Sequence, residues 1–587
     1  MNDLYVTPRL IAPIDASPRL PGSKSMAQRA LVAAALCSER TLVAGAGTCD
    51  DVLAMERGLS QLGYALERRG EDLIVESPSG GKGPAGTTPQ RVDVGESGTA
   101  LRLLTSVAAL TAGRFELTGR PGLLRRPIGE LSRALASLGA SLADREGLPP
   151  VLVEGRELAG GTVRIDASRS SQFVSSLLLV APRFTHGLTV ETTGVLASPG
   201  YLELTRRVLE AFGVSIEIEK RTDGGVRVQV PALQLQSPGC FEVEADWSAA
   251  GAFTLLAELS GGRSAPIGLR EDSLQPDRGF GEVLAGLRGT GPRTVDVARL
   301  PDQTMNLAIA AALRTGTTEL TGAANLRLKE SDRLEVTARE LRRLGGRVEV
   351  LTDGLRIQGG ARLHGGRVDP QGDHRMAMAF AVLGAFVEGV EIDQPGCVAK
   401  SFPGFFDELE AALASRRCIA LIGQRGCGKS TLGRSLAEKL KVEFLDLDER
   451  FVLELGPIPA FVEAQGWPAF REQEARLLQE TLRPDRVVAT GGGVLEAPGA
   501  METLPREAFV LHLDAPLDAL RRRIAADPNR RPSVTGRDTL EELAELEARR
   551  RPDYLACADV TLPAGVSPGE CLDSALAALR QFWAKRA

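Results

Sequence analysis

The stretch CIALIGQRGCGKST, residues 418–431, decides the fold of the C-terminal part of the chain. Its first five residues are apolar and lead directly into a glycine-rich loop, a pattern typical of a buried parallel strand that opens a nucleotide-binding domain. The loop from Gly423 to Ser430 matches G-x-x-x-x-G-K-[ST], and the helical pattern TLGRSLAEKL follows it. The sequence therefore predicts an α/β domain that begins at about residue 416 and binds a nucleotide.

The residue types in this loop suit the phosphates of ATP. Glycines let backbone N–H groups approach the phosphates, and the start of the following helix favours their negative charge. Lys429 can reach the β- and γ-phosphates, and Ser430 can hold Mg²⁺. The predicted ATP-binding residues of the loop are Gly426, Cys427, Gly428, Lys429, Ser430 and Thr431.

Features downstream of the loop indicate a second, smaller substrate. The run FLDLD ends in Asp446 and Asp448, and strand alternation puts both carboxylates on one face, suited to magnesium water and an acceptor hydroxyl. Arg471 lies in FREQE, and the glycines 491–493 follow the strand-like VVAT, where backbone can approach a small polyol closely. Arg530-Arg531-Pro532 lies in a polar stretch that can close over ATP.

Taken together, these residues resemble shikimate kinase over essentially all of residues 418–587. The resemblance implies a P-loop kinase domain with a parallel sheet, like that of nucleoside monophosphate kinases, and Mg²⁺ as cofactor with ATP. It also implies that Arg531 is the lid arginine on ATP and that Ser430 and Asp446 hold the metal, Asp446 through water. The implied shikimate-binding residues are Asp448, Arg471, Gly492 and Arg550. Gluconate kinase is a rival on the same fold, because these arginines suit a carboxylate in either case.

A repeated pattern precedes residue 415. Helix-like segments that end in Gly and continue into an apolar alternation place glycines at 63, 139, 213, 289 and 345, which are 76, 74, 76 and 56 residues apart. A final helical stretch, FFDELEAALAS, falls where a sixth unit should end. We therefore expect six α/β units before a domain boundary between residues 415 and 416.

Basic residues recur in loop-like contexts of this larger part. The first, Lys24, lies in LPGSKSMAQRALVAAAL, where a loop runs into a helix whose free N–H groups favour anions. Such a set in a chain of net charge -6 indicates a multiply anionic ligand, provided that folding brings distant loops together. The eight cations are Lys24, Arg29, Arg102, Arg126, Lys329, Arg333, Arg375 and Lys400.

The strings PGSKS..QR, SGTALR, RPIG, SSQF, LPD, LKESDR, GDHRMAM and AKSFPGFF resemble EPSP synthase, in order and spacing, over residues 1 to about 414. That family transfers the enolpyruvyl group of phosphoenolpyruvate to the 5-hydroxyl of shikimate 3-phosphate. The resemblance implies a two-lobed inside-out α/β barrel of six repeated units without a cofactor. One lobe would comprise about residues 1–20 and 241–415, and the other about 21–240.

The resemblance also implies the ligand contacts. Phosphoenolpyruvate would meet Lys24, Gly98, Arg126, Gln172, Arg333, Arg375 and Lys400. Shikimate 3-phosphate would meet Ser25, Arg29, Ser170, Ser171, Gln172, Ser198, Asp302, Asn325 and Lys329. The reaction adds a proton to a methylene carbon and removes one from a hydroxyl, and carboxylates held among cations suit such transfers. We therefore expect Glu330 and Asp302 to be the acid/base residues, assisted by Lys24. His374 is expected to be structural or to support the residues that contact the ligands.

One position departs from the family pattern. Many relatives carry Asn where this sequence has Glu96, next to the phosphoenolpyruvate pocket. A carboxylate there repels the substrate unless it pairs with Arg102 or turns away.

Two other functions stay open: a UDP-N-acetylglucosamine enolpyruvyl transferase for the first part of the chain, and a nucleotide sensor without turnover for the second.

Composition limits the remaining possibilities. The negative net charge argues against generic nucleic-acid binding, and no apolar run reaches the ~18 residues that a membrane helix needs. The start MNDLYVTPRL lacks a secretory layout, so we expect a cytoplasmic protein. The eight cysteines include no Cys-x-x-Cys pair, so they indicate neither a zinc site nor a disulfide framework. The expected partners are the small molecules shikimate, ATP, shikimate 3-phosphate and phosphoenolpyruvate.

Overall fold

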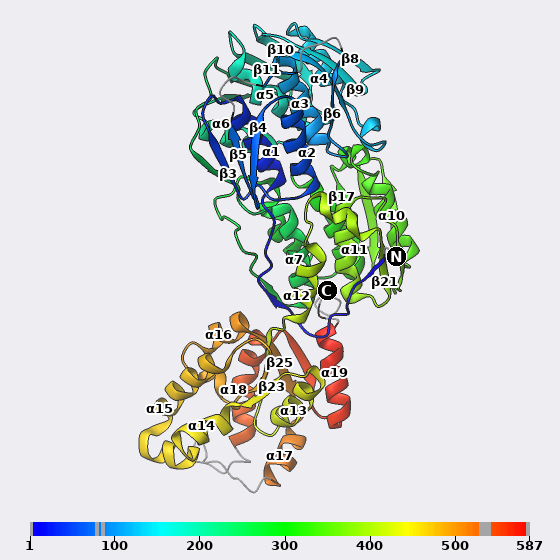
Figure 1. Cartoon of the computed structure of the whole chain (residues 1–587). Helices are drawn as coiled ribbons and strands as arrows, with labels where there is room; N and C mark the ends of the chain where they lie inside the picture. Colours follow the sequence, from blue (N-terminus) through cyan, green and yellow to red (C-terminus); the bar gives the residue numbers. More distant parts are fainter. Residues whose placement is uncertain (1–3, 77–80, 84–87, 527–541, 581, 583–587) are drawn as a thin grey trace. The chain divides into compact units, whose positions relative to one another are not determined.

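The computed structural model describes residues 4–76, 81–83, 88–526, 542–580 and 582. The chain divides into two compact units of helices and strands, which agrees with the predicted α/β class (Figure 1). The first unit comprises the described residues of Met1–Thr7, Arg19–Leu255 and Pro266–Glu408. The second comprises those of Pro8–Pro18, Leu256–Ala265 and Leu409–Ala587.

Four sheets of the first unit share one strand order. Each of these sheets has four strands. One edge strand runs parallel to its neighbour, and the two remaining pairings in the sheet are antiparallel. In spatial order the sheets are β14 (Cys240–Glu242), β3 (Thr41–Ala44), β5 (Asp72–Glu76), β4 (Ala65–Arg69); β6 (Gln90–Asp93), β7 (Gly113–Thr118), β9 (Leu148–Gly155), β8 (Ser141–Arg145); β10 (Gly161–Asp166), β11 (Leu188–Thr193), β13 (Val226–Val230), β12 (Glu217–Lys220); and β16 (Arg293–Asp296), β17 (Gly316–Thr321), β19 (Gly354–Gly359), β18 (Arg347–Leu351).

Smaller pairings complete the strands before residue 415. One three-stranded sheet has the order β1 (Leu4–Val6), β21 (Val390–Asp393), β20 (Gly366–Val368), and one pair joins β2 (Asp15–Ala16) to β15 (Arg263–Ser264). The helices of this part are α1 (Lys24–Leu36), α2 (Asp50–Gln61), α3 (Gly98–Leu110), α4 (Gly129–Ser137), α5 (Ser171–Val180), α6 (Gly200–Ala211), α7 (Trp247–Ser260), α8 (Phe280–Ala285), α9 (Thr304–Leu313), α10 (Arg333–Arg343), α11 (His374–Phe386) and α12 (Phe405–Ala414).

The glycine repeat has a structural cause in four of its five positions. Gly63, Gly139, Gly213 and Gly345 have φ of 88°, 93°, 80° and 91°, and each lies between a helix and the last strand of one sheet, namely β4, β8, β12 or β18. Glycine takes this left-handed conformation without a side-chain clash, so it ends the helix. Gly289 also has a positive φ, but it leads into β16, the opposite edge strand, so it is not equivalent to the others.

Helices lie at the centre of the part that precedes residue 240. In α1 every residue from Met26 to Leu36 is buried, and α3 is buried almost throughout. Both helices are largely apolar, and a helix that is apolar on most sides is covered on most sides; in α1 the polar residues Gln28 and Arg29 are buried too. These helices and α5 pack against one another, and they share one continuous core with the sheets of β3, β7 and β11.

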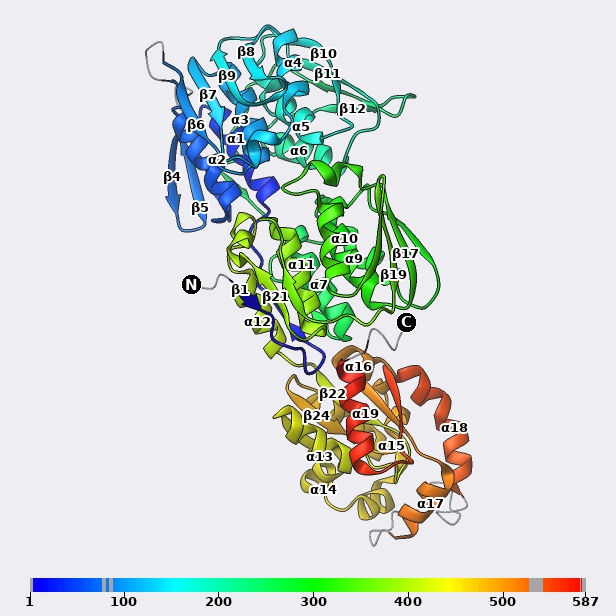
Figure 2. The same ribbon diagram turned by 90° about the vertical axis from the view of Figure 1, so that its right-hand side faces the viewer.

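The second unit contains a five-stranded parallel sheet (Figure 2), as predicted for the kinase part. Alternate residues of its central strand face different cores: Ile419 packs with α13 and α19, whereas Ala420 packs with α15, α16 and α18. Its strands, in spatial order, are β23 (Glu443–Asp446), β24 (Arg486–Ala489), β22 (Cys418–Ile422), β25 (Ala508–Asp514) and β26 (Val560–Pro563). Its helices are α13 (Lys429–Leu440), α14 (Leu447–Leu455), α15 (Ile458–Thr481), α16 (Ala500–Glu507), α17 (Leu517–Ala525), α18 (Glu542–Cys557) and α19 (Pro568–Arg580).

Segments from early in the chain belong to the second unit. Ala12 is part of the core that lines one face of the parallel sheet. Arg417 donates to the backbone oxygens of Gly261 at 3.0 Å and Pro505 at 2.6 Å. A Cβ at Gly261 would lie 2.7 Å from a ring carbon of Phe509 and 2.8 Å from one of Phe582. The second unit is therefore built from more of the chain than the residues that follow the P-loop.

We predict that Gly261→Ala destabilises the second unit. The φ of +69° strains any side chain by about 1 kcal/mol, and overlap with the two rings adds about 1–3 kcal/mol. Gly499→Ala is the matched control, since its φ is +72° and nothing lies within 4 Å of its Cβ. Calorimetry can identify the unfolding transition of the second unit as the one whose melting temperature ATP raises. That melting temperature should be lower in Gly261→Ala than in Gly499→Ala. Equal shifts in both variants would contradict the described packing.

Candidate active sites

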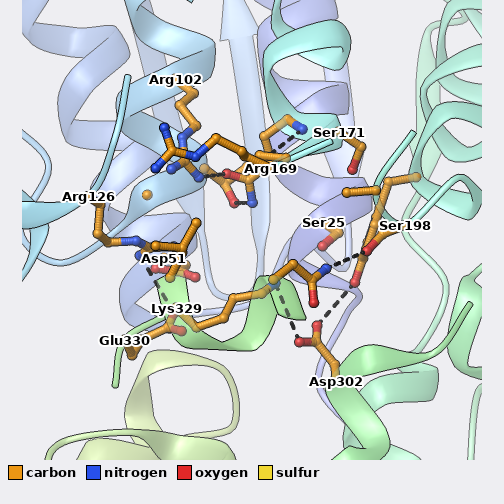
Figure 3. A pocket seen from close by; sticks show the side chains of 18 of the residues that line it. Ser25, Asp51, Arg102, Arg126, Arg169, Ser171, Ser198, Asp302, Lys329 and Glu330 are labelled. Atoms are coloured by element: carbon orange, nitrogen blue, oxygen red, sulfur yellow. Dashed lines mark hydrogen bonds and ion pairs between the residues drawn. The ribbon is translucent and has the colours of Figure 1, made fainter. Parts of the chain in front are cut away.

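A pocket in the first unit lies where several helices begin (Figure 3). Lys24, Gly98, Ser171, Arg333 and His374 are the first residues of α1, α3, α5, α10 and α11, and all of them line this pocket. Free backbone N–H groups give each helix start a partial positive charge. The backbone and the basic side chains therefore favour anions at the same place.

The structure brings together the residues that the sequence predicted for this site. Lys400 is the one that does not line the pocket, although its Nζ lies 3.8 Å from a carboxylate oxygen of the lining residue Glu330. The predicted residues on the wall are Lys24, Ser25, Arg29, Gly98, Arg126, Ser170, Ser171, Gln172, Ser198, Asp302, Asn325, Lys329, Glu330, Arg333 and Arg375.

Arg333 is the centre of the charge network in the pocket. Its side chain is 2% exposed, and its guanidinium donates to Asp302 Oδ1 at 2.8 Å, Asp373 Oδ2 at 2.7 Å and Glu330 Oε2 at 3.0 Å. Burial works to lower the pKa of Arg333, but the surrounding carboxylates outweigh it and the pKa is raised. One buried cation thus holds three carboxylates in place.

Besides Arg333, the carboxylate of Asp302 contacts other cations. Its Oδ2 lies 3.2 Å from Arg375 Nη2 and accepts from the hydroxyl of Tyr201 at 3.3 Å, and its Oδ1 lies 3.6 Å from Lys329 Nζ. Burial works to raise the pKa of Asp302, but Arg375, Lys329 and Arg333 outweigh it and hold the pKa well below its usual value. Asp302 is therefore ionised.

Asp51 is a pocket residue that the sequence reasoning missed. Its carboxylate accepts from Lys24 Nζ at 3.1 Å and from Lys400 Nζ at 3.2 Å. Burial works to lower the pKa of Lys24, but the charge of Asp51 outweighs it and the pKa is raised, so Lys24 is protonated. In the sequence Asp51 is one of two acidic residues at a helix start, a common position that carries no functional signal.

Glu330 faces several cations. One oxygen lies 3.7 Å from Arg126 Nη1 and 3.8 Å from Lys400 Nζ, while the other contacts Arg333. Burial works to raise the pKa of Glu330, but these cations outweigh it and hold the pKa well below the usual value. Gly98 leaves the space that Arg126 occupies, because a Cβ there would lie 2.5 Å from the guanidinium carbon.

Polar side chains and two buried arginines form a further part of the pocket lining. Arg29 donates to Ser25 O at 2.7 Å and to Ser175 Oγ at 3.1 Å, and burial lowers its pKa to about 10. Arg102 donates to Gln172 Oε1, and burial lowers the pKa of Arg102 to about 9. Other lining residues that the sequence reasoning did not assign are Thr99, Arg169 and Tyr201.

Glu96 and His374 differ in their position relative to the pocket. Glu96 is not among the described residues that line the pocket; its carboxylate lies against Gly122, while its backbone oxygen accepts from Lys400 Nζ at 2.8 Å. The carboxylate is therefore turned away. His374 lines the pocket, and its Nε2 lies 3.5 Å from Lys24 Nζ. Burial and the charge of Lys24 hold the pKa of His374 well below its usual value.

The glycine-rich loop of the second unit lines its own pocket. Gly426 to Thr431 all lie on the wall, and α13 begins at Lys429, whose Nζ donates to Gly423 O at 2.7 Å. Ser430 Oγ donates to Asp446 Oδ2 at 2.5 Å, so a hydroxyl and a carboxylate meet beside the loop. Arg531, predicted to cover ATP, lies outside the described residues.

A third pocket adjoins the loop. It is lined by Asp448, Arg471, Gly492 and Arg550, the residues predicted to hold the second substrate, and by the aromatic rings of Trp467 and Phe470. Arg425, Asp448 and Gly492 line this pocket and the pocket of the glycine-rich loop. A small molecule in the third pocket would therefore lie beside the phosphates of a nucleotide on the loop.

Among the described residues, no three or more His, Cys, Asp or Glu side chains are grouped to hold a metal ion. Within the same part of the chain, no helix is both long and apolar enough to cross a membrane.

The fold and the pockets define an α/β enzyme with one cleft for small anions and a separate kinase domain. The model of the family EPSP synthase (3-phosphoshikimate 1-carboxyvinyltransferase) matches residues 8–409, and the chain belongs to this family. The model of the family Shikimate kinase matches residues 425–580. With both domains on one polypeptide, the chain is a bifunctional shikimate-pathway enzyme.

Individual proteins support this assignment. The 3-phosphoshikimate 1-carboxyvinyltransferase of Methanoculleus marisnigri is 42% identical over 415 residues, which cover 68% of this chain and 96% of that protein. The pentafunctional AROM polypeptide of Schizosaccharomyces japonicus is 31% identical over 626 residues, which cover 95% of this chain and 39% of the polypeptide. A solved EPSP synthase from Acinetobacter baumannii has the same fold, with a TM-score of 0.57 and 24% identity over 70% of this chain and 98% of that one.

We predict that His374 stays neutral between pH 8 and pH 5.5. An unfolded histidine takes up a proton near pH 6.5, whereas the folded one does not, so the contribution of His374 to stability falls as the pH drops below that value. In the ¹³C-histidine-labelled chain, the His374 ring resonances are those that disappear in His374→Gln. Their chemical shifts should stay constant over this pH range. A midpoint near pH 6.5 for the His374 resonance would contradict the described contact with Lys24.

Proposed function

We propose that the first domain transfers the enolpyruvyl group of phosphoenolpyruvate to the 5-hydroxyl of shikimate 3-phosphate without a cofactor. The observation that carries this proposal is one pocket in which helix starts, basic side chains and ionised carboxylates meet. Such a pocket suits two anions that must lie side by side, because each is attracted by fixed positive charge. We place this domain at residues 1–415 and propose for it the inside-out barrel of six units in two lobes.

We propose that both substrates contact residues of this one pocket. Phosphoenolpyruvate would lie by Lys24, Gly98, Arg126, Gln172, Arg333, Arg375 and Lys400, and shikimate 3-phosphate by Ser25, Arg29, Ser170, Ser171, Gln172, Ser198, Asp302, Asn325 and Lys329. Both sets include basic side chains and helix starts, in keeping with ligands that carry phosphate and carboxylate groups. Incoming anions would replace part of the internal pairing of these cations with carboxylates.

The charge states support an assignment of the proton transfers. Asp302 and Glu330 are ionised in the free site, so each begins as a proton acceptor. Lys24 is protonated, so it begins as a donor. We propose that Asp302 takes the proton of the 5-hydroxyl, that Lys24 donates the proton added to the methylene carbon of phosphoenolpyruvate, and that Glu330 takes a proton from the resulting methyl group when phosphate leaves.

The second domain, residues 416–587, would phosphorylate shikimate at its 3-hydroxyl with ATP. Gly426 to Thr431 and Arg531 would bind ATP, and Asp448, Arg471, Gly492 and Arg550 would hold shikimate. The adjoining pockets, which share Asp448 and Gly492, favour direct transfer from ATP to the acceptor. The oxygens of Ser430 and Asp446 are the hard donors that Mg²⁺ prefers, and Mg²⁺ there would neutralise phosphate charge. The product of this domain would be the acceptor of the first.

We predict that Lys429→Ala abolishes phosphorylation of shikimate but leaves enolpyruvyl transfer unchanged. The variant removes the cation that faces the phosphates, and Lys429 lies outside the first unit. ATP consumption and shikimate 3-phosphate formation measure the first effect on the full chain. Loss of transferase activity in this variant would contradict independent sites.

Conversely, Glu330→Gln should slow enolpyruvyl transfer ~100-fold or more and spare the kinase. The amide keeps the shape of the side chain but loses the charge that faces Arg126, Arg333 and Lys400. Phosphate release from phosphoenolpyruvate with shikimate 3-phosphate measures the rate. A variant with the wild-type rate would remove Glu330 from the proton transfers.

Three alternatives have their own readouts in the wild-type chain. A nucleotide sensor would bind ATP but form no product from shikimate. A gluconate kinase would form product from gluconate in place of shikimate. A UDP-N-acetylglucosamine enolpyruvyl transferase would transfer the enolpyruvyl group to UDP-N-acetylglucosamine in place of shikimate 3-phosphate.

A further inference from the structure

Glu496 lies next to the arginines of the third pocket but has no role in the function proposed above. It ends a short 3-10 helix, η7 (Val494–Glu496), that directly follows the glycines 491–493. Glu496 is not among the described residues that line the pocket, whereas Arg471 and Arg550 are. The carboxylate therefore meets these arginines from outside the pocket wall.

The contacts of Glu496 join the arginines to one another. Its Oε2 accepts from Arg471 Nη2 at 2.6 Å and from Arg550 Nη2 at 3.1 Å, and its Oε1 accepts from Arg550 Nε at 2.9 Å. Arg549 Nη2 adds a fourth contact at 2.5 Å. Burial works to raise the pKa of Glu496, but these arginines outweigh it and lower the pKa to about 2. Glu496 is therefore ionised at neutral pH.

Arg471 and Arg550 share Glu496 as a counter-ion, and Arg471 Nη1 also donates to Glu474 Oε2 at 2.6 Å. Arg471 and Arg550 come from α15 and α18, and their side chains are 13% and 8% exposed, so solvent screens their mutual repulsion poorly. Glu496 offsets that repulsion and fixes the direction of both guanidinium groups. Gly493 makes the arrangement possible, because a Cβ there would lie 2.1 Å from Arg471 Nη2.

The pocket side of Arg550 is left for the substrate. Its Nη1 is directed to Gln424 Oε1 at 3.4 Å, and Gln424 lines the pocket. That distance is long for such a bond, so an anionic oxygen in the pocket can compete for the same nitrogen. Glu496 therefore leaves one edge of Arg550 open to the pocket while holding the other.

We propose that Glu496 is a positioning residue of the kinase domain: it holds Arg471 and Arg550 together from behind, so that both meet the carboxylate of the acceptor. This assignment rests on the proposed function of the third pocket. Glu496 itself does not touch the reacting atoms. Its loss should weaken acceptor binding and leave the ATP loop and the phosphoryl transfer step largely unaffected.

The test compares Glu496→Gln with wild type in steady-state kinetics of the full chain. We expect the KM for shikimate to rise ~10-fold, while kcat and the KM for ATP change less than about twofold. The matched control is Glu454→Gln, since Glu454 also bridges two arginines, Arg450 at 2.9 Å and Arg476 at 3.2 Å, but lies outside the pocket. The control should keep wild-type constants. Transferase activity measures the amount of intact chain.

An unchanged KM for shikimate in Glu496→Gln would overturn the assignment. A lowered KM would overturn it too, because it would show that Glu496 competes with the substrate for the arginines. If Glu496→Gln does not fold, Glu496→Asp carries the test: a raised KM for shikimate alone supports the assignment, and unchanged constants overturn it. If wild-type enzyme does not phosphorylate shikimate, the proposed function fails and this assignment fails with it.

Discussion

The first domain depends on the neutralisation of one buried cation. Arg333 is almost fully enclosed and contacts the carboxylates of Asp302, Glu330 and Asp373. Breaking such a network by removing one partner leaves an uncompensated charge in the protein interior, which costs several kcal/mol. The same contacts hold Asp302 and Glu330 in their ionised forms among Lys24, Lys329 and Arg375. Structure and proposed chemistry thus rest on the same residues.

Repetition of the fold explains how one pocket collects so much positive charge. Four sheets share one strand order, and the buried helices that accompany them begin at a common place. Lys24 and Arg333 are the first residues of their helices, so each adds a side-chain charge to the charge of a helix start. Protein carboxylates such as Asp51 neutralise the free pocket, and the substrates' phosphates and carboxylates can take over part of that role.

The kinase domain uses the same principle on a smaller scale. Glu496 neutralises and orients Arg471 and Arg550 before an acceptor arrives, as Asp51 does for Lys24 and Lys400. In both domains a carboxylate contacts two cations that come from different elements. Rigid, paired cations lose less side-chain entropy when they meet a ligand than free ones do.

Much of this architecture could be predicted from the sequence. The P-loop and the spacing of Gly63, Gly139 and Gly213 have local physical causes, a phosphate cradle and left-handed helix ends, and such signals are visible in a single chain. Asp51 could not be predicted, because its role comes from a lysine 349 residues away. Likewise, nothing local marks Ala12 and Gly261 as parts of the second unit, since only folding brings them to Phe509.

The central claim is that one chain performs two consecutive steps on anionic substrates. The most direct measurement incubates the purified chain with shikimate, ATP, Mg²⁺ and phosphoenolpyruvate, and quantifies all products. We expect one ADP and one inorganic phosphate for every enolpyruvyl shikimate 3-phosphate formed. Formation of shikimate 3-phosphate that is never consumed, or consumption of phosphoenolpyruvate only when shikimate 3-phosphate is supplied, would contradict the account.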